Sequence, residues 1–256
     1  MKAIDKLVKT VAKLRSPKGC PWDKEQTHKT LKRYLIEEAY EALDAIDKND
    51  SNELMEELGD VLLQIVLHAE IANEKKRFNL NDIANHINKK MISRHPHVFS
   101  NVKVKDSEEV IKNWEIIKKG EKPKRKSIFD GIPKALPALL KALKVSKKAS
   151  RAGFEWEKEE DIWKTLESEI LEFKKARKQK NKIRLSEEIG DILFTAVNIA
   201  RWHKLDPEEA LNSGTKKFIK RYNGVNKLIQ KGNNNKKLSS KELEKLWKKI
   251  KLNERK

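Results

Sequence analysis

Residues 35–60 read LIEEAYEALDAIDKNDSNELMEELGD, and the chain contains a second copy of this stretch. Residues 166–191 read LESEILEFKKARKQKNKIRLSEEIGD, at a constant offset of 131 and without a gap, and nine of the 26 positions are identical. Apolar residues recur at spacings of three and four, which is the period of an amphipathic α-helix. The polar run KNDS (48–51) interrupts the first copy. Each copy therefore predicts a hairpin of two helices.

The duplication extends beyond the two hairpins. GCPWDKE (19–25) matches GFEWEKE (153–159) upstream, at an offset of 134. Downstream, Lys90 and Arg94 match Lys217 and Arg221 at 127, and Trp114 matches Trp247 at 133. One helical module therefore occurs twice in the chain, as in proteins built from internal repeats.

The halves are separated by KGEKPKRK (119–126), a polar stretch broken by Gly and Pro. We expect an N-terminal module at 1–120, a linker at 121–133 and a C-terminal module at 134–256. Apolar periodicity predicts one helix over about 52–73 in the first module and another over about 134–150 at the start of the second.

The composition supports an all-α protein. Lys, Glu, Leu and Ala, which are strong helix formers, dominate long stretches, whereas only 9 Gly and 7 Pro are present. The single cysteine, Cys20, excludes an intramolecular disulfide and fits the reducing cytoplasm. No apolar run approaches the roughly 18 residues of a transmembrane helix, so we expect no membrane association. The formal net charge of +19 attracts polyanions such as nucleic acid or nucleotide phosphates, although interleaved Glu residues favour ordinary solvated helix faces.

Each copy of the repeat carries four acidic residues in the same pattern, as two pairs spaced three residues apart. They are Glu38, Glu41, Glu57 and Asp60 in the first copy, and Glu169, Glu172, Glu188 and Asp191 in the second. Residues three apart lie on one face of a helix, about one turn apart. Each pair therefore presents two carboxylates where an amphipathic helix would place apolar core residues.

The position of the turn brings the two pairs of each copy to matched heights. The first turn centres near position 49.5, and Glu41 and Glu57 lie almost equally far from this centre along the chain. The second turn centres near position 180, and Glu172 and Glu188 are equidistant from it. Because an α-helix rises about 1.5 Å per residue, facing pairs match in height to within about 1.5 Å. We therefore expect four carboxylates to converge in each hairpin.

Four converging carboxylates repel one another unless a cation lies between them. Hard oxygen ligands prefer Mg²⁺, with Mn²⁺ as the alternative. A di-iron carboxylate bundle, the rival helical metal site, uses Glu-x-x-His, whereas both second pairs here end in Asp. No G-x-x-x-x-G-K-[ST] loop occurs, which excludes a P-loop phosphate site. The sequence therefore predicts a magnesium site that handles phosphate, with a plain charged helix face as the alternative for any single pair.

These motifs resemble those of the MazG family of nucleoside triphosphate pyrophosphohydrolases, part of an all-α pyrophosphatase superfamily. The family signature is E-E-x-x-E, a spacer and E-x-x-D, which is matched fully by Glu37, Glu38, Glu41, Glu57 and Asp60. Further stretches that resemble family motifs are GCPWDKEQTH (19–28), KMISRHPHVF (90–99), the GFEW stretch (153–156) and EEIGDILF (187–194). The resemblance covers nearly the whole chain.

The resemblance implies Mg²⁺-dependent cleavage of nucleoside triphosphates between the α and β phosphates, with broad base specificity, in nucleotide-pool control or house-cleaning. It also implies a homodimer. Each hairpin leaves apolar faces beside its acidic residues, and we expect the two tandem modules to bury these faces by four-helix-bundle packing, either between the two repeats or between two chains. The family places a Lys and an Arg one turn apart near the phosphates. The matching positions are Lys217 and Arg221, with Lys90 and Arg94 as their counterparts, and Trp247 and Trp114 are candidates for stacking on the base.

The sequence constrains the identity of the general base less than the identity of the metal ligands. A spare carboxylate next to the ligands, Glu37 or Glu187, is the candidate for taking the proton from the attacking water. Ser168 stands where the second copy would have the first Glu of E-E-x-x-E. If that position is an essential ligand or base, the second site is weakened, and otherwise it survives.

The two halves also differ in length after the hairpin. The stretch from Asp60 to Lys90 is four residues longer than the stretch from Asp191 to Lys217. We expect the four extra residues near 74–79 to displace the cations of the first half by about one turn, roughly 5.4 Å. The second half is therefore expected to carry most of the hydrolysis.

The alternative function is a basic helical module that binds nucleic acid or a protein partner without catalysis. Such a module needs a cationic face free of acids. Here the acids are the recurring element, which disfavours this interpretation, and we expect no nucleic-acid partner.

Overall fold

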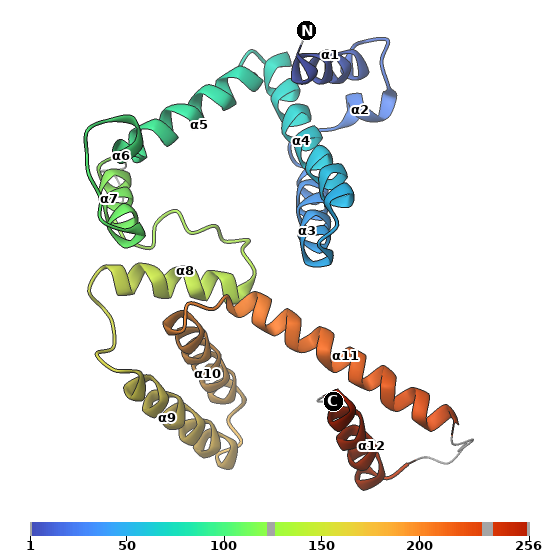
Figure 1. Ribbon diagram of the computed structural model, residues 1–256, viewed down its shortest axis with the longest axis vertical. Coiled ribbons are helices and arrows are strands. Elements are labelled where there is room, and N and C mark those ends of the chain that lie inside the picture. Colours follow the sequence, from blue (N-terminus) through green and yellow to red (C-terminus); the bar gives the residue numbers. More distant parts are fainter. Residues whose placement is uncertain (1, 122–125, 232–237, 255–256) are drawn as a thin grey trace. The chain divides into compact units, whose positions relative to one another are not determined.

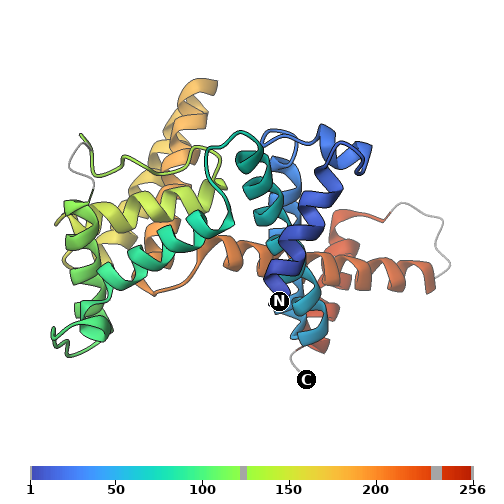
Figure 2. The same cartoon turned by 90° about the horizontal axis from the view of Figure 1, so that it is seen from above.

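The structure is a computed structural model that describes residues 2–121, 126–231 and 238–254. Two views show helices joined by loops (Figures 1 and 2), and the described residues contain no β-strand. The all-α prediction is therefore confirmed. The chain divides into two compact units, Met1–Pro123 and Lys124–Lys256. Residues 122–125, inside the linker predicted at 121–133, lie outside the described residues.

Unit 1 is built around an antiparallel hairpin of α3 and α4 (Figure 1). Its helices are α1 (Ala3–Arg15), α2 (Pro21–Glu25), α3 (Lys32–Lys48), α4 (Ser51–Glu74), α5 (Leu80–Arg94), α6 (Pro96–Phe99) and α7 (Ser107–Gly120). Helix α1 packs on α4 and closes a small core of Val11, Leu31, Val66, Leu67 and Ile71.

Local chemistry explains why the first hairpin turns where it does. Asn49 ends α3 in the left-handed conformation, with φ of 54°, which Asn tolerates better than most residues. The side chain of Asp50 then accepts hydrogen bonds from the backbone N–H groups of Asn52 and Glu53. This N-cap satisfies two donors at the start of α4. The turn predicted at 48–51 is therefore confirmed.

Unit 2 repeats the hairpin with α9 and α10, and α8 packs against α10. Its helices are α8 (Ala138–Arg151), α9 (Glu159–Lys178), α10 (Lys182–Trp202), α11 (Pro207–Lys231) and α12 (Ser240–Asn253). Asn181 caps α10 as Asp50 caps α4. The buried Ser146 hydroxyl of α8 donates a hydrogen bond to Oδ1 of Asn198 in α10, at 2.5 Å.

The first helix of unit 2 begins later than the periodicity predicts. Helix α8 starts at Ala138 rather than at Lys134, because Pro137 adopts an extended backbone, with ψ of 145°, and occupies the N-cap position. The residue before a proline is also disfavoured in the α-region, which keeps Leu136 out of the helix.

The extra four residues of the first half do not lie mainly in the connection at 74–79. Helix α4 continues three residues further beyond Asp60 than α10 continues beyond Asp191. The connections that follow differ by only one residue, because 75–79 corresponds to 203–206. Three of the four extra residues therefore lengthen the hairpin helix, which corrects the sequence-based expectation.

None of the helices in the described ranges is both long enough and apolar enough to cross a membrane.

Candidate metal centre

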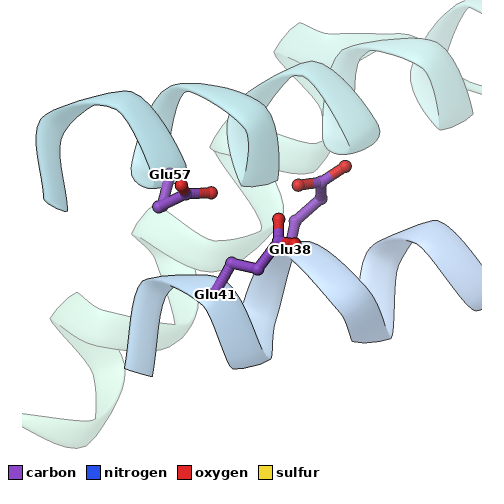
Figure 3. Close-up of side chains that lie close together, drawn as sticks. All are labelled: Glu38, Glu41 and Glu57. Atoms are coloured by element: carbon purple, nitrogen blue, oxygen red, sulfur yellow. The ribbon is translucent and has the colours of Figure 1, made fainter. Parts of the chain in front are cut away.

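Each hairpin brings three of its predicted carboxylates together. In unit 1 they are Glu38, Glu41 and Glu57, and Figure 3 shows their side chains in the space between α3 and α4. One ligand oxygen from each residue lies within 4.8 Å of those of the other two. In unit 2 the equivalent residues are Glu169, Glu172 and Glu188, with the same limit of 4.8 Å. Three of the four carboxylates predicted to converge are therefore grouped in each hairpin, and Asp60 and Asp191 lie outside the groups.

The charges of neighbouring carboxylates help to raise the pKa of Glu38 and of Glu57 in unit 1. Partial burial raises the pKa of Glu38 most, and the charge of Asp60 raises it further, followed by a hydrogen bond and charge from Glu41 and by the charge of Glu57. The pKa of Glu57 is raised by burial first, then by the charges of Glu41 and Asp60. Asp60 lies outside the group of three but is the fourth charge that acts on it.

Unit 2 shows the same electrostatics. Burial raises the pKa of Glu169 most, followed by the charges of Asp191, Glu172 and Glu188. In both units, every charge that shifts the pKa of the first glutamate, Glu38 or Glu169, belongs to a carboxylate. A cluster of oxygen ligands with unrelieved repulsion fits a hard divalent cation such as Mg²⁺ or Mn²⁺.

The two candidate general bases lie at the edge of these clusters. Glu37 and Glu187 are exposed, and neither belongs to a group of three. Each directly precedes a clustered glutamate, so the helical rotation of about 100° per residue points it away from the centre of the group. Ser168 is also exposed.

The cationic residues of unit 1 lie on the helix pair α5 and α7, which is called the arm of this unit. Arg94 is buried, and its guanidinium carbon lies 4.9 Å from the centre of the Trp114 ring. The ammonium of Lys118 lies 4.5 Å from the same ring centre. Arg94 also donates hydrogen bonds to the Glu121 carboxylate. The Trp114 ring is thus already in contact with two cations of its own unit.

The equivalent arm of unit 2, made of α11 and α12, has a different aromatic environment. Trp247 lies 5.2 Å from Phe218 between ring centres, and Phe218 lies 6.4 Å from Tyr222. Phe218 and Tyr222 are 57% and 52% exposed. Arg221 donates from Nε to Glu254 at 2.7 Å, and Lys217 is exposed. Sequence reasoning missed Phe218 and Tyr222, although their spacing of four places them on one helix face.

Within the described part of one unit, the helix that carries the predicted phosphate-binding cations does not pack extensively on the helix that carries the first acidic pair. The main packing partners of α5 are α4, α6 and α7, and those of α11 are α8, α10 and α12. Neither arm helix packs extensively on α3 or α9, which carry the first acidic pair of each hairpin. The charges that shift the pKa of Glu38, Glu57 and Glu169 all belong to carboxylates, and none belongs to Lys90, Arg94, Lys217 or Arg221.

Comparison with known proteins gives consistent matches along the chain. Residues 26–99 and 157–226 match the family model described as the MazG nucleotide pyrophosphohydrolase domain. The first segment contains α3, α4 and α5, and the second contains α9, α10 and most of α11. Both acidic clusters and both Lys–Arg pairs therefore fall inside the matched segments, whereas Trp114 and Trp247 fall outside them.

Three curated relatives align with most of this chain. The nucleoside triphosphate pyrophosphohydrolase/pyrophosphatase MazG of Thermotoga maritima is 45% identical over 230 residues, which is 89% of this chain and 87% of the relative. The nucleoside triphosphate pyrophosphohydrolase of Escherichia coli (strain K12) is 41% identical over 234 residues, or 90% and 89%. The uncharacterized protein YabN of Bacillus subtilis is 46% identical over 248 residues, or 96% and 51%. With two family domains and relatives in Thermotoga maritima and Escherichia coli aligned over 87% and 89% of their own length, the chain belongs to the MazG nucleotide pyrophosphohydrolase family.

Proposed function

We propose that this protein hydrolyses nucleoside triphosphates to nucleoside monophosphates and pyrophosphate with Mg²⁺, and that it controls or cleans the nucleotide pool of the cytoplasm. The observation that carries the proposal is the duplicated group of three glutamates, each with an aspartate beside it. The names of the Thermotoga maritima and Escherichia coli relatives support the reaction. Mn²⁺ suits the same oxygen ligands.

The residues of unit 2 have distinct roles in this reaction. Glu169, Glu172, Glu188 and Asp191 would hold the cation, which would supply charge neutralisation at the phosphates and a more acidic water. A carboxylate oxygen of Glu187 accepts the proton of the attacking water, and Glu37 is the candidate in unit 1. Lys217 attracts the triphosphate as a point charge, and Arg221 binds phosphate oxygens through its planar guanidinium. Lys90 and Arg94 are the counterparts in unit 1.

Broad base specificity follows from the aromatic residues of α11 and α12. Trp247, Phe218 and Tyr222 offer ring faces beside Lys217 and Arg221. Stacking on an aromatic side chain tolerates every base, because every base has a π-face. In unit 1, Arg94 and Lys118 already lie against Trp114. The aromatic cluster of unit 2 is therefore the better base-binding surface.

A second copy of the chain covers the exposed apolar face of the first hairpin. Ile36, Leu43, Ile46 and Met55 are 48%, 53%, 55% and 72% exposed. Their equivalents in unit 2 are Glu167, Lys174, Arg177 and Ser186, which suit solvent. Two such apolar hairpins form a four-helix bundle when they pack together. The hairpin of unit 1 is therefore the proposed contact of a homodimer.

One experiment tests the reaction directly. The purified protein is incubated with ATP and Mg²⁺, and the products are separated by chromatography. We expect AMP and pyrophosphate, and we expect no turnover when EDTA replaces the cation. ADP and inorganic phosphate as the main products would overturn the proposed cleavage position.

A further inference from the structure

Each arm contains an arginine that is paired with a glutamate. In unit 1, Arg94 donates from Nε to the Glu121 carboxylate at 3.2 Å and from Nη2 at 2.5 Å. In unit 2, Arg221 donates from Nε to Oε2 of Glu254 at 2.7 Å. The side chains of both arginines are largely buried, at 4% and 19% exposed. These are the two arginines to which the proposed function gives a phosphate-binding role.

The two ion pairs are equivalent in the repeat, which the acidic motifs alone do not reveal. Glu121 is the first residue after α7, and Glu254 is the first residue after α12. The offset between these two glutamates is the same as the offset that relates Trp114 to Trp247. The same carboxylate is therefore present at the same place in both copies, at the end of the helix that packs on the arginine's helix.

Helix stability does not account for a glutamate at these positions. The C-terminal end of a helix carries partial negative charge, so an acidic residue there is unfavourable and a basic residue is favourable. Both copies nevertheless have an acid, and in both the acid accepts from the arginine. The carboxylate of Glu121 is also kept ionised, because its hydrogen bond with Arg94 and the charges of Arg94 and Lys90 lower its pKa. The contact that both glutamates make is the ion pair with arginine, so this ion pair explains an acidic residue at these positions.

We propose that Glu254, and Glu121 in unit 1, are positioning residues that fix the plane of the arginine guanidinium for binding the triphosphate. A guanidinium has five N–H donors in a rigid fork. Glu254 engages Nε of Arg221, so the terminal nitrogens keep donors for phosphate oxygens. Because the carboxylate also partly neutralises the charge of Arg221, this arginine mainly orients the triphosphate. The exposed Lys217 supplies the electrostatic attraction of the triphosphate. This inference rests on the proposed function of Arg221.

The competing explanation is that Glu254 only pins α12 to α11. The two explanations differ in what substitution does to substrate affinity. Removing Glu254 leaves an uncompensated positive charge, which by itself would strengthen the attraction of a triphosphate. A rise in KM after this substitution therefore has to come from lost orientation. Because Arg221 is the partner through which Glu254 would pin α12, both explanations lose this contact in Arg221→Ala. They differ in that a loosened helix lowers the unfolding temperature, whereas lost orientation raises KM with little change in the unfolding temperature.

The test uses Glu254→Ala, Glu254→Gln, Arg221→Ala and the double variant Arg221→Ala/Glu254→Ala in the full chain. We expect Glu254→Ala to raise KM for ATP at least about tenfold, with a smaller change in kcat. Glu254→Gln should raise it less, about threefold, because an amide oxygen still accepts from Nε but without charge assistance. In the Arg221→Ala background, Glu254→Ala should add nothing. Equal effects of Glu254→Ala on KM in both backgrounds would show that Glu254 acts independently of Arg221 and would overturn the proposal. A lower unfolding temperature of Glu254→Ala with an unchanged KM would show a purely structural role.

Glu244→Ala is the matched control. It removes one carboxylate from the same helix, but Glu244 pairs with Lys248 on the surface of α12 rather than with Arg221. We expect its KM to stay at the wild-type value or to fall slightly. All variants are assayed well below their unfolding temperatures, which circular dichroism measures.

A binding measurement separates this inference from the proposed function. Inorganic triphosphate is titrated into wild-type protein and into each variant by calorimetry, without turnover. A wild-type protein that binds triphosphate but releases no pyrophosphate from ATP contradicts the proposed function alone. Equal triphosphate affinity in wild-type protein and Glu254→Ala overturns the positioning role, whatever the activity. Affinity that falls in Glu254→Ala and in Arg221→Ala, without a further fall in the double variant, supports it.

Discussion

Glu169 of α9 lies close enough to Asp191 of α10 for the charge of Asp191 to raise the pKa of Glu169, second only to the effect of partial burial. A carboxyl group whose pKa is raised in the folded state binds protons more strongly there than in the unfolded chain. Without a cation, this group's contribution therefore destabilises the fold as the pH rises through the folded-state pKa. A bound divalent cation removes that repulsion.

The first prediction concerns the ligands of unit 2. Glu188→Gln and Asp191→Asn should each lower pyrophosphate release at least about 100-fold, because losing one ligand misplaces the cation. Both variants should unfold at the wild-type temperature or above it when Mg²⁺ is absent, because one like charge has gone. The Mg²⁺-induced rise in unfolding temperature should shrink.

The control for these variants is Glu167→Gln, which removes an exposed acid from α9 that is not part of the acidic cluster. It should keep full activity and the full response to Mg²⁺. Full activity in Glu188→Gln or Asp191→Asn would contradict the assignment of these residues as ligands.

The second prediction concerns which unit performs the hydrolysis. We expect the pair Glu188→Gln/Asp191→Asn to abolish most turnover and the pair Glu57→Gln/Asp60→Asn to leave most of it. The structural reason is that α4 is three residues longer than α10 beyond the acidic pair, which moves the arm of unit 1 along its hairpin. Steady-state kinetics of both double variants measures the contribution of each unit. The reverse ordering would mean that Ser168 has disabled the second site.

The third prediction concerns assembly through the first hairpin. Leu43→Lys copies the residue that unit 2 has at the equivalent position and should shift the protein from dimer to monomer. A charged side chain in the centre of an apolar interface is costly unless it is paired. Light scattering at micromolar concentration measures the change. Ile183→Lys is the control, because it adds the same charge at an exposed apolar residue of the unit 2 hairpin, which is not part of the proposed contact. A fully active wild-type monomer would contradict the homodimer.

The fourth prediction concerns a histidine pair in unit 1. The Nδ1 atoms of His28 and His68 lie 2.7 Å apart, and the rings are nearly parallel, at 9°. This distance leaves room for one proton between the two Nδ1 atoms, so the pair of rings carries at most one positive charge. Burial and then the charge of His28 lower the pKa of His68. The stability from neutral His68 is therefore present above the unfolded-state value, near 6.5, and is lost as the pH falls below it.

Thermal unfolding between pH 7.5 and 5.5 measures this dependence. Wild-type unit 1 should lose stability over that range, and His68→Gln should lose much less. His86→Gln, at an exposed position of α5, should behave as the wild type does. Identical pH dependence in His68→Gln and wild-type protein would exclude the histidine pair as its source.

The hairpins and their acidic clusters were predictable from the sequence because they depend on local geometry. The spacing of Glu38 and Glu41, the turn at Asn49 and the helical rise are sufficient to bring carboxylates of α3 and α4 together. The duplication then provides an independent repetition of the same arrangement. Nothing further along the chain is needed to form this part of the site.

The ion pairs and aromatic contacts of the arms were not predictable in the same way. Glu121 and Arg94 are far apart in the sequence, and their contact depends on how α7 packs on α5. The end of α4 at Glu74 agrees to within one residue with the helix predicted over about 52–73, and Ile71 and Ala72 are buried at this end. The comparison of spacings missed instead that α10 ends three residues sooner beyond its acidic pair, so most of the difference in length lies in the helices and not in the connection. Tertiary burial, rather than local preference, determines these features.

The greater length of α4 limits how the two halves can exchange parts. Three additional helical residues add about 4.5 Å and about 300° of rotation before the chain leaves the hairpin. An arm transplanted alone from one half to the other would therefore leave its new hairpin in the wrong direction. The unit that can recombine intact is the hairpin together with its own arm. Gene conversion between the halves, or the design of a chimaera, would have to respect that boundary.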